Sequence, residues 1–237
     1  MKKRYDSARG FSLVELLVGT VLFTIITGAV FSLLMSAQLR YRGESNVTQA
    51  FQQANIALDQ ITRDVHSAGY PAASSFAANV AATQPWSVAL PFSWSPGYTN
   101  VPPLPCVVGV SCGPVPGEYD LIVETDLGDG NGVQWIRYSL QGTTLMRGKT
   151  SKVPGDPVSS TQSSLVPYLE NVMNGSESLP IFVYTFDQSS PPPPPQPSYI
   201  RGVNITLIVQ SAQPDPQTGQ YRKITLTGQA VRFNPNQ

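Results

Sequence analysis

Hydrophobic and polar positions divide the chain into three stretches, and the first is a long uncharged run. Residues 16–39 contain no Asp, Glu, Lys or Arg and are rich in Leu, Val, Ile and Phe. At about 1.5 Å per residue, a helix of this length covers roughly 36 Å, which is enough to cross a hydrocarbon core of about 30 Å. The run therefore predicts a transmembrane helix.

The second stretch is amphipathic. Apolar residues recur three or four positions apart at Val47, Phe51, Ala54, Leu58, Ile61 and Val65. This spacing is typical of a helix with one buried face. Because no proline occurs between Phe11 and Gly69, we expect one continuous helix to about Ala68, with a transmembrane half (11–39) and an amphipathic half (40–68).

The third stretch reads as strands separated by turns and loops. Segments rich in β-branched and aromatic residues lie at 119–126, 133–140, 144–149, 180–186, 199–210 and 221–233. The 22 prolines and 19 glycines fall mostly after residue 69, and a Ser-Pro run at 189–198 is expected to form a stiff polyproline connector. The pattern predicts an α+β fold, in which the helix packs on an antiparallel β-sheet head domain (69–237) with long Pro-rich loops.

The turn LGDGNG lies between the first two predicted strands. Asp126, Asp129 and Asn131 offer oxygen ligands of the kind that calcium prefers. A complete calcium-binding loop would also need a third spaced acidic position and a terminal Glu, which this segment does not have. We expect a plain hairpin turn and leave calcium binding open.

Charge indicates orientation and disfavours nucleic acid as a direct partner. Charged residues make up 13% of the chain and cancel to a net charge of zero, so there is no basic field for a phosphate backbone. Lys2, Lys3, Arg4 and Arg9 precede the apolar run against a single Asp6. This excess of positive charge predicts a cytoplasmic N-terminus and an exported head.

The two cysteines enclose five residues. On the exported side of a membrane, Cys106 and Cys112 are predicted to form a disulfide, because a zinc site would need more ligands than one histidine can add. The bridge would constrain a Pro-rich excursion, residues 85–116, that carries Trp86, Trp94 and Tyr98.

Catalytic chemistry has little support in the sequence. The chain has one histidine and no nucleophile-elbow, zinc-protease or phosphate-loop motif. We expect no enzymatic activity, no cofactor and no metal site. The different-class alternative is a membrane-tethered enzyme or binding module that uses the aromatic residues of the head.

The start of the apolar run carries a specific resemblance. Gly10-Phe11-Ser12-Leu13-Val14-Glu15, after a short basic leader, resembles the class III signal peptide of type IV prepilins and pseudopilins. The resemblance implies that a prepilin peptidase removes the leader 1–10 by cutting between Gly10 and Phe11. It also implies N-terminal methylation of Phe11 and retention of the apolar helix.

Glu15 is a charged residue directly before the uncharged run, at the start of the predicted membrane helix. A carboxylate in hydrocarbon is unfavourable by several kcal/mol unless it is paired, so it is a functional candidate by default. The resemblance implies a role in subunit assembly, in which Glu15 meets the Phe11 amino group of a neighbouring subunit and fixes the helix stagger. The alternative is that Glu15 snorkels to the membrane interface beside the leader.

A narrower resemblance lies at the end of the predicted helix. The segment ALDQITRDVHSAGYP, residues 57–71, is similar to PilW-type minor pilins, with J-type pseudopilins of type II secretion next. It implies a minor pilin that initiates or caps pilus assembly together with other minor pilins, the major pilin and an inner-membrane assembly platform. The implied location is the bacterial inner membrane with the head in the periplasm, followed by the pilus at the cell surface. A type II secretion pseudopilin is the alternative.

Overall fold

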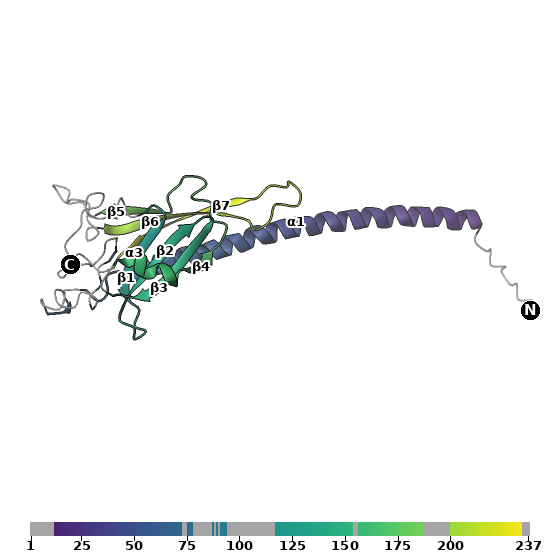
Figure 1. Ribbon diagram of the computed structural model, residues 1–237. Helices are drawn as coiled ribbons and strands as arrows, with labels where there is room; N and C mark the ends of the chain where they lie inside the picture. The colour runs from purple at the N-terminus through teal and green to yellow at the C-terminus, as the bar shows by residue number, and fades with distance from the viewer. Residues whose placement is uncertain are drawn as a thin grey trace, which may run out of the picture.

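The computed structural model describes residues 12–72, 75–77, 87, 89, 91–93, 117–153, 156–186 and 200–233. Its dominant element is helix α1 (Leu13–Ser67), which runs without a break from the free N-terminal end into the head (Figure 1). The helix ends where Gly69 takes a left-handed backbone conformation with φ of 81°, which glycine adopts without strain. The prediction of one long helix is confirmed.

The strands form two antiparallel sheets. The first has the order β1-β2-β3-β4, and its strands are β1 (Asp120–Asp126), β2 (Val133–Gln141), β3 (Thr144–Ser151) and β4 (Val166–Leu169). The second has the order β5-β6-β7, and its strands are β5 (Phe182–Phe186), β6 (Ile200–Gln210) and β7 (Lys223–Val231). The head therefore lies along the C-terminal half of α1, which confirms an α+β fold consistent with type IV pilins (Figure 1).

The prediction of a single sheet was too simple, and the connection between β4 and β5 explains the difference. This connection meets β6 at Asn171, whose carbonyl accepts from the Gln210 amide over 2.9 Å. The buried Asn174 side chain then accepts from the Ile208 amide and donates to the Thr206 carbonyl, both over 2.8 Å. The connection occupies part of the β6 edge, so β4 and β5 belong to different sheets.

Two short elements were missed by the sequence patterns. Strand β4 is four residues long and contains Pro167, so it shows no alternating pattern. Helix α3 (Pro157–Thr161) is one turn long and is followed by a 3₁₀ turn (Gln162–Ser164). Its start was readable, because Asp156 caps the helix and Pro157 occupies the first turn.

The buried face of α1 differs in part from the predicted one. Phe51 is 44% exposed, whereas the sequence pattern had placed it in the buried stripe. More than half of the buried positions in the head-facing half are glycine or alanine; the full set is Gly43, Ala50, Ala54, Ala57, Ile61, Asp64 and Val65. Small side chains let the sheet approach the helix closely, and a Cβ on Gly228 of β7 would lie only 2.9 Å from Leu58 Cδ1. A large ring at position 51 cannot fit between surfaces this close.

Candidate functional site: the exposed half of the long helix and its junction with the head

The N-terminus of α1 has a capping box. The Ser12 hydroxyl accepts from the Val14 amide over 3.3 Å, and the Ser12 amide donates to Glu15 Oε2 over 2.9 Å. Such a box satisfies backbone donors that the first helical turn leaves unpaired. Glu15 therefore has a partner within its own chain, and its position at the mouth of an apolar helix has a local explanation. The Ser-x-x-Glu spacing was readable from the sequence, although the expectation for Glu15 considered only a neighbour or the membrane interface.

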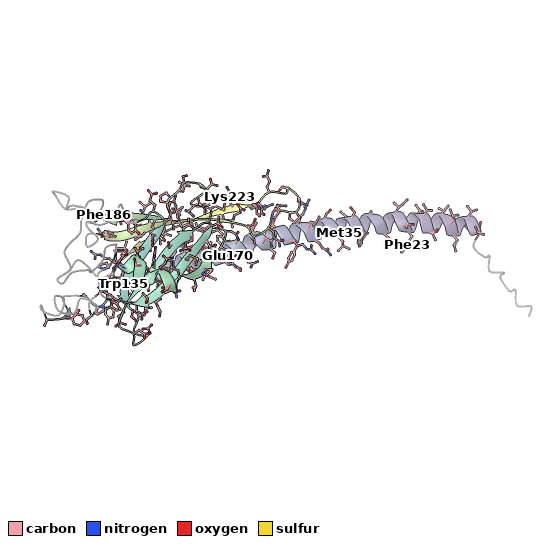
Figure 2. All side chains as sticks on the ribbon, viewed as in Figure 1. Phe23, Met35, Trp135, Glu170, Phe186 and Lys223 are labelled. Carbon is pink, nitrogen blue, oxygen red and sulfur yellow. The ribbon has the colours of Figure 1, made fainter. Side chains whose placement is uncertain are left out.

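The first half of α1 is apolar, and its side chains from Leu13 to Met35 are exposed. Its large apolar side chains from Leu13 to Met35 project away from the axis, and Figure 2 shows Phe23 and Met35 doing so with no head element beside them. The helix is long and apolar enough to cross a membrane, and none of its most apolar window is buried within the chain. Such a surface is stable only if lipid or other helices cover it.

Two threonines in this half form hydrogen bonds within the helix. Thr20 donates to the Leu17 carbonyl over 2.9 Å, and Thr24 donates to the Thr20 carbonyl. At Gly19 and Gly28, an added Cβ would meet no other atom within 4 Å. These features suit a helix surrounded by apolar groups, with small residues where another helix can approach.

Asp64 fastens the other half of α1 to the first sheet. Its buried carboxylate accepts from the Tyr138 hydroxyl over 2.6 Å and from Arg147 Nη2 over 2.9 Å. Gln60, one turn earlier on α1, donates to the same carboxylate over 2.8 Å. Because Tyr138 lies on β2 and Arg147 on β3, one acidic side chain ties the helix to two strands.

The environment keeps the Tyr138 hydroxyl protonated. Burial, followed by the negative charge of Asp64, raises its pKa well above the ordinary value, so it serves as a donor to Asp64. The Arg147 guanidinium carbon lies 5.6 Å from the ring centroid of Tyr138 and 5.8 Å from that of Tyr168. These contacts indicate a structural junction, in which charge pairing and cation–π contact act together.

A second buried ion pair lies in the distal part of the head. Lys152 Nζ donates to Glu124 Oε2 over 2.6 Å, and the exposed fractions of the two side chains are 1% and 0%. Trp135 Nε1 and the Ser93 hydroxyl donate to the other Glu124 oxygen. Burial lowers the pKa of Lys152, and the Glu124 charge opposes this shift. With no surface access, the pair fits a structural role better than a catalytic one.

An open groove lies between α1 and the ends of β4 and β6. Its volume is about 460 Å³, and its lining includes the amide side chains of Asn46, Gln49, Gln53, Asn171 and Gln210. These groups can donate and accept hydrogen bonds. The titratable residues in the lining are Tyr168 and Glu170.

The LGDGNG segment forms the expected hairpin turn. Asp129 accepts from Lys149 over 2.8 Å and from Gln134 over 2.6 Å, and Asp126 accepts from the Gly128 amide over 2.8 Å. Both carboxylates thus hold the turn together. Within the described residues, no group of three or more His, Cys, Asp or Glu side chains is placed to hold a metal.

The predicted site residues are divided between described and undescribed parts of the chain. Glu15 lies in the capping box, whereas Gly10, Phe11, Cys106 and Cys112 fall outside the described residues. The structure therefore leaves the cleavage position and the disulfide as predictions. The aromatic residues Trp86, Trp94 and Tyr98 and the Ser-Pro run at 189–198 also fall outside the described residues.

Comparison with known proteins identifies the N-terminal segment. Residues 6–31 match the family described as the prokaryotic N-terminal methylation motif. This match supports the type IV pilin and pseudopilin class, in which a prepilin peptidase processes the chain and the subunit assembles with other pilins. No curated protein and no solved structure matches the chain.

Proposed function

We propose that the chain is a minor type IV pilin of the PilW type, a non-enzymatic subunit that helps to initiate or cap a pilus. The pilin class is supported by the exposed apolar half of α1, which begins at a capping box and coincides with the methylation motif at residues 6–31. The assignment as a minor pilin of the PilW type rests on the similarity of residues 57–71. A helix of this kind can first anchor the subunit in a bilayer and then pack among the helices of other subunits.

The domain order follows from this function. The leader (1–10) is removed after Gly10, the new N-terminal Phe11 is methylated, and residues 11–39 anchor the subunit in the inner membrane. Residues 40–68 continue the helix into the head, which occupies 69–237 in the periplasm and later at the pilus surface. Partners are the prepilin peptidase, the assembly platform, other minor pilins and the major pilin.

Processing is tested by the intact mass of the protein extracted from the membrane of the cells that produce it. We expect a mature chain that starts at Phe11 and carries one added methyl group. A mature N-terminus at another residue would overturn both the proposed class and the assembly role of Glu15.

Glu15 is tested with two substitutions, because its side chain contributes both a hydrogen-bond acceptor for the Ser12 amide and a negative charge. Glu15→Gln keeps an acceptor for the Ser12 amide but removes the charge, whereas Glu15→Ala removes both. If Glu15 pairs with the Phe11 amino group of a neighbour, both variants lose co-purification with other pilins and are absent from sheared pili. The membrane pool should stay at the parent level, because removing a charge does not hinder insertion. Assembly of the Gln variant at the parent level would show that Glu15 acts as a helix cap alone.

The alternative, a minor pseudopilin of type II secretion, rests on the similarity of residues 57–71 to J-type pseudopilins. The two functions differ in the partners that the processed subunit retains. Mass spectrometry of proteins that co-purify after cross-linking in intact cells distinguishes a set of pilus subunits from a set of secretion-system subunits.

A further inference from the structure

The loop between β6 and β7 reaches closer to the apolar half of α1 than the strands it connects. Figure 1 shows this hairpin extending over α1 beyond the strands, in the direction of the free end of the helix. Its contact with the helix is at Gly43, the first fully buried residue of α1, where an added Cβ would lie 3.5 Å from Pro216 Cδ. Leu39, one turn before Gly43, is half-buried.

The contact lies at the depth of lipid headgroups. Leu39 is the last residue of the uncharged run, and Gly43 follows it by about 6 Å along the helix axis. The polar headgroup layer extends about 5 to 8 Å beyond the hydrocarbon core on each side. If residues 16–39 span the bilayer, the loop that covers Gly43 lies within this layer.

The loop has a defined shape before any contact with lipid. Asp215 is 7% exposed and its Oδ2 pairs with Arg222 Nη2 over 2.5 Å, while its Oδ1 accepts from the Gln217 amide over 2.8 Å. Backbone bonds close the turn, from Gly219 to Asp215 over 2.7 Å and from Asp215 to Gln220 over 2.8 Å. A pre-formed loop loses little conformational entropy on binding.

Several exposed side chains at this level favour a membrane interface, although the Glu44 carboxylate is exposed there as well. Tyr221 is 51% exposed in the loop, and Tyr41 is exposed on α1 beside Arg40 and Arg42. Tyrosine is enriched where a protein crosses the headgroup layer, and arginine can place its cation among lipid phosphates. The adjacent Asp215 carboxylate is engaged by Arg222, so it presents little negative charge to those phosphates.

We propose that the β6–β7 loop is a second membrane contact, which seats the head on the phospholipid headgroups beside the anchor helix. The occupant of this surface is lipid, because the loop packs on Gly43, only four residues beyond the last residue of the predicted membrane span. Contact with the bilayer through both the anchor helix and the loop fixes the distance of the head from the membrane and its rotation about the helix axis before assembly. The contact is broken when the subunit leaves the membrane for a filament.

The inference rests on the membrane anchoring assumed in the proposed function. A photoreactive residue placed at three positions in turn tests the anchoring of α1 and the lipid contact of the loop separately. The full-length chain is reconstituted in vesicles of phosphatidylethanolamine and phosphatidylglycerol, with p-benzoylphenylalanine replacing Phe23, Tyr221 or Leu127 in turn. Phe23 reports on the anchor and Tyr221 on the loop. Leu127 is the matched control, because it is 42% exposed in the β1–β2 turn. That turn adjoins Thr125, which bonds to the Ser67 carbonyl, about 36 Å along α1 from Gly43.

After irradiation, mass spectrometry of the digested protein measures phospholipid adducts. We expect adducts at positions 23 and 221 and none at 127. Adducts at 23 alone would overturn the loop contact and leave the anchor standing, whereas no adduct at 23 would overturn the anchor itself. Equal adducts at 221 and 127 would show that the head meets lipid at random and would also refute the proposal.

Discussion

Replacement of Asp64 tests whether one buried carboxylate holds the head on the helix. The Asp64 side chain is 4% exposed and receives hydrogen bonds from Tyr138, Arg147 and Gln60. Asp64→Ala removes the negative charge and the acceptor for all three donors. The Tyr138 hydroxyl, which is buried, loses the oxygen to which it donates.

The magnitude follows from the burial of each partner. Breaking a buried ion pair by removing one member typically destabilises a protein by about 3 to 5 kcal/mol. Water can reach the Arg147 side chain, which is 24% exposed, so we expect the lower end of this range, about 3 kcal/mol. This corresponds to roughly a hundredfold change in the unfolding equilibrium and, for a head of this size, to a melting temperature lower by about 6 to 12 °C.

The assay is urea unfolding of the full-length chain in detergent, followed by tryptophan fluorescence and near-UV circular dichroism. Asp59→Ala is the matched control, because Asp59 is exposed on the same helix, and it should change the free energy of unfolding by less than about 0.5 kcal/mol. The double variant Asp64→Asn/Arg147→Met removes both charges but keeps an acceptor oxygen for the Tyr138 hydroxyl, so it should recover much of the loss. A double variant as unstable as the sum of its two single variants would refute the coupling inferred from the structure.

Two further predictions concern two other ion pairs of the head, Lys152–Glu124 and Arg222–Asp215. Lys152→Met leaves the buried Glu124 carboxylate without its cation and should lower the free energy of unfolding by about 3 to 5 kcal/mol. Glu124→Gln/Lys152→Met removes both charges but keeps an acceptor oxygen for Trp135 and Ser93, so it should recover most of this loss. Equal losses in the two variants would contradict the pairing. Hydrogen bonds from the Gln217 amide and the Arg222 side chain lower the pKa of Asp215 from its ordinary value of 3.8. The folded loop therefore gains stability above that value and loses it as pH falls through the lowered pKa. Amide hydrogen exchange of residues 211–222, measured relative to the intrinsic rate, should become faster at low pH. This pH response should disappear in Asp215→Asn. The same pH response in Asp215→Asn as in the parent protein would count against the ion pair as its cause.

The sequence by itself determined the elements that depend on local chemistry. The uncharged run at 16–39 and the absence of proline up to Gly69 were sufficient to predict one long helix with an apolar half. The glycines and aspartates of the LGDGNG turn were sufficient to predict a hairpin, because turn geometry is set by adjacent residues. The capping box at Ser12 and Glu15 was also readable, since it needs only the spacing of two residues.

Tertiary structure decided which helix positions are buried and which polar groups meet. A period of three or four residues identifies an apolar face of a helix, but it does not fix which of two adjacent apolar residues is buried. Ala50 is buried and Phe51 is exposed. The close approach of β7 to the helix favours the smaller side chain at the interface. Asp64 would be exposed by its polarity alone; it is buried because Tyr138 and Arg147 arrive from strands far along the chain. The placement of the β6–β7 loop on Gly43 has the same origin, because the lengths of the two strands and the direction in which they cross the helix set how far the loop reaches. Such contacts join residues with no local relation in the sequence, and their energies become available only after the sheets have packed on the helix.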